Sequence, residues 1–234
     1  MQLRPKSASP EPSLAEQIQR LLRLLRDPGE AWAAFSPYIG IGRKRRLDPI
    51  TDVAGLCHFL ETRASFVAQT SLYGYLRTRA GQRYPELFDN QVFIRSINQA
   101  KWQIWLACLS DLAVYAGGLL SLAAPSAAGR VGPLIEAAVA RTLEETGVPP
   151  DAGPEFLAGA QEVRARLAGC DWSEVTDSEL AFSQSPKALV KWAPVVDKLK
   201  ELDEPIVLNS VRFRWQEVRR DLRRCLDPAA LLRS

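Results

Sequence analysis

The feature that most constrains the fold is an apolar run from Ile104 to Ala124, in which Asp111 is the only charged residue. Asp89-Asn90 before the run and Pro125-Ser126 after it are typical helix ends, so we predict a long helix near 90–124. A helix this apolar must be surrounded by other apolar surfaces. We therefore predict an all-α fold, an irregular helical bundle of about six to eight helices around this central helix.

The spacing of apolar residues and of helix breakers predicts further helices on both sides of the central one. Thr51-Asp52 and Gly81 mark the ends of one of them. We expect Pro194 to bend or split a later helix, and Pro205 to lie in the first turn of the last one. The predicted ranges are 53–80, 132–146, 154–168, 185–202 and 204–226. No segment shows the alternation typical of a strand.

The ends of the chain differ from its middle in composition and periodicity. Residues 1–12 are polar and Pro-rich without periodicity, which predicts a disordered tail and lacks the apolar core of a signal peptide. We expect a single helical domain over 13–226, a C-terminal tail over 227–234 and a cytoplasmic protein that is not secreted.

The four cysteines are far apart and form no CxxC pair. Metal sites normally place two ligands within a few residues of each other. The pattern predicts free thiols, buried on helix faces in a reducing compartment, and no metal or cofactor.

Asp111 is the first candidate for a polar core or ligand site. A buried carboxylate needs a partner, and we expect an ion pair or a hydrogen bond, best with an arginine of another helix such as Arg63 or Arg77. The alternative is a polar contact in a ligand cavity or a partner groove.

His58 is the only histidine, and it lies three residues before Glu61, on the same helical face. That spacing suits one metal or one proton shuttle, although a di-iron helical site needs two such pairs. The structural reading is a partly buried, hydrogen-bonded histidine. With no GxSxG, HExxH or Gly-rich phosphate loop, the sequence favours a non-enzymatic protein. A hydrolase that uses His58 with Ser65 or Ser71 stays open.

The segment 104–124 is also long enough to cross a bilayer, which needs ~20 apolar residues. An aspartate in the middle of such a helix costs ~2.5–3.5 kcal/mol on insertion scales. Two glycines and flanks of weak charge also argue against a span. We favour a buried core helix and leave a single membrane span as the alternative.

Basic residues near the N-terminus predict a surface for a membrane or a partner. A Leu/Arg helix near 14–26 and a basic run next to aromatic side chains together favour adsorption to an anionic membrane. The residues of this predicted surface are Arg20, Arg23, Trp32, Arg43, Lys44, Arg45 and Arg46. Nucleic acid is disfavoured, because the net charge is only +3 and Glu217 and Asp221 interrupt the arginines of the last helix.

Three runs, at 63–88, 96–120 and 209–223, resemble a group of short proteobacterial proteins of unknown role. Automated labelling calls some members of that group esterases. The resemblance spans most of the chain, but it brings no nucleophile elbow or oxyanion loop, so it implies no catalytic residue.

These patterns together predict a non-enzymatic helical protein that acts by protein–protein contact, as an assembly, scaffold or regulatory factor. We expect it at the cytoplasmic face of a bacterial inner membrane. The alternatives are a hydrolase, a single-span membrane protein, and a small-molecule carrier whose cavity surrounds Asp111. The oligomeric state stays open.

Overall fold

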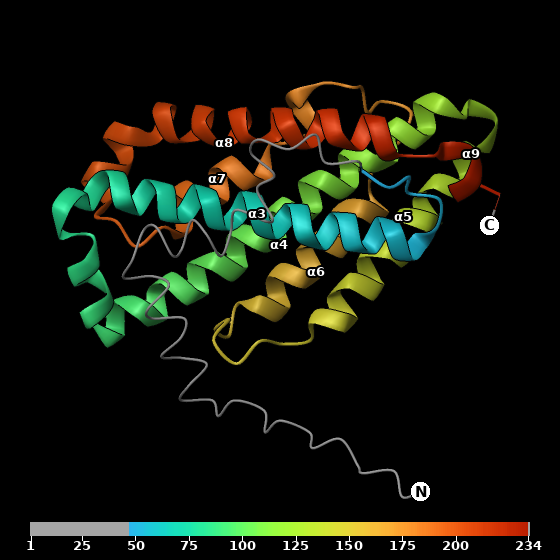
Figure 1. Cartoon of the computed structure of the whole chain (residues 1–234). Coiled ribbons are helices and arrows are strands. Elements are labelled where there is room, and N and C mark those ends of the chain that lie inside the picture. The colour runs from blue at the N-terminus through green and yellow to red at the C-terminus, as the bar shows by residue number, and fades with distance from the viewer. Residues whose placement is uncertain (1–46, 234) are drawn as a thin grey trace, which may run out of the picture. The chain divides into compact units, whose positions relative to one another are not determined.

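The computed structural model describes residues 47–233, and these form an all-α bundle around the predicted central helix (Figure 1). The predicted fold class is therefore confirmed. The seven α-helices of this part of the chain are α3 (Val53–Ala80), α4 (Gln91–Ala123), α5 (Ala128–Thr146), α6 (Phe156–Ala168), α7 (Gln184–Trp192), α8 (Asp197–Cys225) and α9 (Pro228–Leu231). The tail predicted at 1–12 and the Leu/Arg helix predicted near 14–26 lie outside the described residues.

Short 3₁₀ helices complete the connections between the α-helices. They are η1 (Gly81–Arg83), η2 (Pro85–Asp89), η3 (Pro125–Ala127) and η4 (Glu179–Ala181). The one pairing of extended residues among those described is an isolated parallel bridge between Ile50 and Leu226.

The central helix α4 begins where its sequence signal placed it. The side chain of Asn90 accepts hydrogen bonds from the backbone amides of Val92 and Phe93, which caps the helix. Helices α3, α5, α6 and α7 all pack against α4, as Figure 1 shows. Within the described residues α4 is the one helix apolar and long enough to cross a membrane, and 78% of its most apolar window is buried inside the bundle. This burial favours the core helix over the membrane span.

Helix α3 shows why a cap can be predicted from sequence. The Asp52 carboxylate accepts from the backbone amide of Gly55 at 2.7 Å, which satisfies an orphan donor of the first turn. Gly81 ends the helix with φ of +54°, a conformation that side chains other than glycine rarely adopt. Both predicted ends of this helix are confirmed.

The glycine pair Gly117-Gly118 of α4 allows close packing of a neighbouring segment. A Cβ atom on Gly117 would lie 2.2 Å from the Trp172 ring, and one on Gly118 would lie 2.3 Å from Val175. The neighbour is the connection between α6 and η4, which rests directly on the backbone of α4.

The C-terminal third differs from the prediction in two places. Helix α7 ends at Trp192, so Pro194 separates two helices as expected, but the next one begins at Asp197 and holds Pro205 in its interior rather than its first turn. Residues predicted as a tail contain α9, whose Leu231 and its neighbour Leu232 are buried. Four residues are too short a helix to give a periodic signal.

Candidate functional site

The Asp111 carboxylate, in the middle of α4, is fully buried and receives donors from two other helices. Arg166 of α6 donates to Oδ1 at 2.7 Å. The backbone amides of Gln184 and Ser185 donate at 2.7–3.1 Å, and the Ser185 hydroxyl donates at 2.7 Å. These amides open α7, whose own N-cap residue, Ser183, makes no side-chain capping bond. Asp111 therefore caps α7 from outside it.

The same group of contacts extends to α8 and to the 3₁₀ helix η4. The Ser185 hydroxyl accepts from Trp215 Nε1 at 2.9 Å, while Arg166 donates to Ser110 Oγ and to the Ala181 carbonyl, each at 3.0 Å. Burial raises the pKa of the Asp111 carboxyl, and the Arg166 charge and the Ser185 hydrogen bonds act to lower it. The carboxylate thus joins α4, α6 and α7 at one buried point.

The predicted ion pair of Asp111 with an arginine of another helix is confirmed, but both named partners are wrong. Arg63 pairs with Asp221 of α8 at 3.2 Å, and Arg77 is exposed near the end of α3. Both arginines lie on α3, whereas Asp111 faces the side of α4 that α6 and α7 cover. Hydropathy does not specify which helix covers which side.

The structure does not bring His58 and Glu61 to this point. His58 is exposed, so the expectation of a partly buried histidine is wrong, and Glu61 accepts from Ser65 at 3.3 Å. Among the described residues no hydrogen bond joins the His58 side chain to Ser65 or Ser71. No contact in this part of the chain therefore supports the hydrolase hypothesis. Ser71 is buried, and its hydroxyl has no hydrogen-bond partner in this part of the chain.

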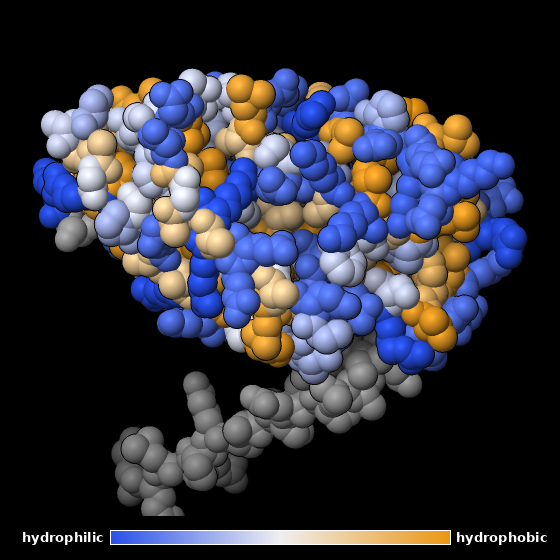
Figure 2. Space-filling view, turned by 180° about the vertical axis from the view of Figure 1, so that it is seen from behind, coloured by the Kyte–Doolittle hydropathy of each residue, from blue (hydrophilic) through white to orange (hydrophobic). Residues whose placement is uncertain are grey.

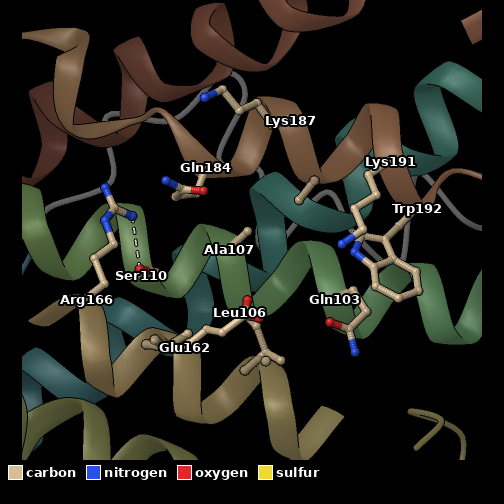
Figure 3. Close-up of a pocket in the computed structure, with 13 residues that line it drawn as sticks. Gln103, Leu106, Ala107, Ser110, Glu162, Arg166, Gln184, Lys187, Lys191 and Trp192 are labelled. Atoms are coloured by element: carbon tan, nitrogen blue, oxygen red, sulfur yellow. Dashed lines mark hydrogen bonds between the residues drawn. The ribbon is translucent and has the colours of Figure 1, made fainter. Parts of the chain in front are cut away.

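A pocket of about 470 Å³ opens beside the Asp111–Arg166 pair, between α4, α6 and α7 (Figure 3). This volume lies in the range of ordinary small-molecule sites. Figure 3 shows Arg166 and Ser110 at one end of the pocket and Gln103 and Trp192 at the other. Arg166 is therefore the member of the ion pair that forms part of the pocket wall.

Gln103 gives the pocket a polar group without a partner. Its side chain is only 7% exposed, and Nε2 has no hydrogen-bond partner among the described residues. A Cβ on Gly159 of α6 would lie 3.0 Å from the Gln103 Oε1 and 2.9 Å from Leu106. The missing side chain at Gly159 therefore leaves the room that the Gln103 amide occupies.

The charged side chains of the pocket wall are mainly basic. The pocket wall includes three cations, Arg166, Lys187 and Lys191, and one acid, Glu162. The Lys191 ammonium lies 5.2 Å from the centre of the Trp192 ring, which holds the charge near an aromatic face. A flat molecule with an anionic group matches this combination of charge and ring.

Sequence reasoning missed most of these residues, although a signal existed for one of them. Gln103 is polar within the aromatic, apolar run Trp102-Gln103-Ile104-Trp105, where a buried amide needs a partner. Arg166, Lys187 and Lys191 look like ordinary solvated charges, because nothing local shows that α6 and α7 face each other across α4.

The predicted membrane or partner surface lies outside the described residues. This holds for all of its members, Arg20, Arg23, Trp32, Arg43, Lys44, Arg45 and Arg46. The four cysteines are free thiols as predicted, and three of them are buried, with Cys170 half-buried. Over residues 47–233 no group of three His, Cys, Asp or Glu side chains is placed to hold a metal ion.

Comparison with known proteins assigns the chain to no family. The resemblance to the proteobacterial group therefore stays a prediction, and the function is argued from the pocket. No family model, no curated protein and no solved structure matches the chain.

Proposed function

We propose that this protein binds a small anionic molecule in the pocket between α4, α6 and α7, as a carrier or a ligand-dependent regulatory protein. The observation that carries the proposal is Gln103, a buried amide donor without a partner in a pocket that three cations line. A buried donor without a partner costs about 1–3 kcal/mol, and a ligand oxygen would recover that loss.

Each part of the wall has a separate task in this proposal. Lys187 and Lys191, which are not held in an ion pair by any described residue, attract a carboxylate, sulfonate or phosphate group. Trp192 supplies an apolar face for a flat part of the ligand. Asp111 fixes Arg166 in the wall, so it is a positioning residue that does not touch the ligand.

The proposal is for binding, because the described side chains that line the pocket include one carboxylate, Glu162, and no histidine or cysteine. An anionic fluorescent probe, anilinonaphthalene sulfonate, has the required combination of ring and charge. Fluorescence titration of the full chain at low salt is expected to give saturable binding of one probe per chain.

Two variants of equal charge change make this titration specific. Lys187→Gln/Lys191→Gln removes two cations from the pocket and is expected to weaken probe binding about tenfold or more, or ~1.4 kcal/mol. Arg130→Gln/Arg164→Gln removes two exposed charges elsewhere and should leave the affinity unchanged. Equal losses in both double variants would show nonspecific charge attraction and would overturn the proposal.

A role in protein contact is a second proposal, and the apolar face of α8 favours it. Leu202, Ile206 and Phe213 of that helix are 70%, 72% and 71% exposed. Large exposed apolar side chains on one helix face are typical of contact surfaces.

Peripheral attachment to an anionic inner-membrane surface also stays a proposal, and flotation with anionic liposomes at low salt tests it. No flotation would exclude it.

A further inference from the structure

Of the three cations in the pocket wall, Arg166 is already used by the fold. Its guanidinium donates to Asp111 at 2.7 Å, and to Ser110 and the Ala181 carbonyl at 3.0 Å each. The Asp111 carboxylate, which is fully buried beside it, compensates its charge. The ion pair therefore adds no net charge to the pocket, although Arg166 is part of its wall.

The charges that remain for a ligand are two lysines of α7 and one glutamate of α6. Lys187 and Lys191 are four residues apart, so they lie on the same face of α7. Figure 3 shows them on one side of the pocket, with Glu162 on α6 across from them. All three residues are exposed, and none of their side chains forms an ion pair within residues 47–233. Together these three side chains leave one net positive charge.

One net positive charge matches a ligand with one negative charge. Moving a charged group from water into a pocket costs free energy unless an opposite charge compensates it. A monoanion leaves the occupied pocket neutral. The second charge of a dianion has no cation left to compensate it, and the Glu162 carboxylate across the pocket repels it. The charges of the wall therefore favour a single negative charge over two.

We infer that the pocket takes a flat organic acid with a single negative charge, a carboxylate or a sulfonate, and that Glu162 disfavours doubly charged anions such as phosphate monoesters. The inference rests on the proposed ligand binding and narrows its ligand class. The Lys191 ammonium lies 5.2 Å from the centre of the Trp192 ring, which places a positive charge next to the surface for a flat ring. Glu162 does not bind the anion but limits how many negative charges the pocket accepts.

Two naphthalene compounds of different charge test this preference. Naphthalene-1-sulfonate and 1-naphthyl phosphate share the ring system, and both end in a tetrahedral group with three terminal oxygens. At about pH 8 the sulfonate carries one negative charge and the phosphate ester carries two, because the second pKa of a phosphate ester is about 6. Displacement of anilinonaphthalene sulfonate from the full chain, at fixed ionic strength, should show that the sulfonate binds about tenfold more tightly than the phosphate.

Substitution of Glu162 tests whether this residue sets the preference. The repulsion that Glu162→Gln removes is proportional to the ligand charge, so the phosphate should bind about tenfold more tightly and the sulfonate about threefold. The preference for the sulfonate then falls to about threefold. Hydrophilic side chains cover much of the surface, as Figure 2 shows for one face, so a control for general charge effects is needed. Glu144→Gln, at an exposed position of α5, makes the same change in net charge and should leave the preference unchanged.

The outcomes separate this inference from the proposed function. Saturable probe binding with a phosphate that binds as tightly as the sulfonate would leave the proposed function intact and overturn the inference. Equal shifts of the preference in Glu162→Gln and Glu144→Gln would also overturn it. A wild-type chain without saturable probe binding would remove the proposed function, and the inference with it. A sulfonate preference that only Glu162→Gln reduces supports both.

Discussion

Asp111 shows how one residue can hold several helices and also position a side chain of a pocket wall. Its carboxylate accepts hydrogen bonds at the first turn of α7 and pairs with Arg166 of α6. Because Arg166 also lines the pocket, the position of this cation depends on a residue that is not part of the pocket lining. The sequence predicted that Asp111 would be paired, since a buried carboxylate without a partner is costly.

Replacement of this carboxylate is expected to be strongly destabilising. Asp111→Ala leaves the Arg166 charge and two backbone amides without their acceptor, so we expect the free energy of unfolding to fall by about 3–5 kcal/mol. Urea denaturation followed by circular dichroism measures this change. Asp197→Ala, at a side chain 91% exposed, should cost about 1 kcal/mol or less. A similar small loss in both variants would contradict the structural role of Asp111.

At the scale of whole helices, local sequence signals predicted those helix ends that are capped by residues next to them in the sequence. Asp52, Asn90 and Gly81 gave the predicted ends of α3 and α4, because each acts through nearby backbone atoms. The start of α7 was predicted at 185, one residue from where the helix begins, but its capping acceptor was not predicted. Its capping acceptor is Asp111, which lies 74 residues from Ser185 in the chain. Pro205 was misplaced because α8 continues through it.

The contact between α4 and the connection that contains Trp172 predicts how much stability a side chain at Gly117 would cost. Gly117→Ala is expected to lower the free energy of unfolding by about 1–3 kcal/mol, since the new Cβ overlaps the Trp172 ring. Gly129→Ala, in α5, meets nothing within 4 Å and should cause no loss. Paired thermal melts of the two variants measure the difference. Equal stability of the two would show that the connection does not rest on α4.

For the molecule as a whole, burial of weak acids predicts how stability changes at high pH. Burial raises the pKa of all four tyrosines in the described part of the chain, and of Tyr75 to about 12. The folded chain therefore keeps protons that the unfolded chain, with tyrosine pKa values near ~10, has lost. Stability is fully present below about pH 10 and is expected to fall as the pH rises toward 12.

Tyr75 allows this dependence on pH to be separated into contributions. Its hydroxyl donates to Asp203 at 2.9 Å, and Tyr75→Phe removes the titrating group while it keeps the ring. Urea denaturation at a series of pH values should show a shallower alkaline decline for the variant than for the wild type. Parallel curves over that range would mean that Tyr75 ionises alike in the folded and unfolded chain.

The pocket forms only where helices from distant parts of the sequence pack together. Its wall comes from α4 near Gln103, α6 near Arg166 and α7 near Lys191, which are far apart in the sequence. Periodicity predicted that these helices exist and which faces are apolar. It could not predict how they are arranged around α4, so a cavity near Asp111 was only one of the alternatives and its basic residues were not named.

A crystal structure of the chain grown with anilinonaphthalene sulfonate tests the central claim, ligand binding between α4, α6 and α7, most directly. We predict one probe in the pocket, with its sulfonate near Lys187 and Lys191, its rings on Trp192, and an oxygen within hydrogen-bond reach of Gln103 Nε2. A probe bound at another surface, with the pocket empty in the same crystal, would contradict the account.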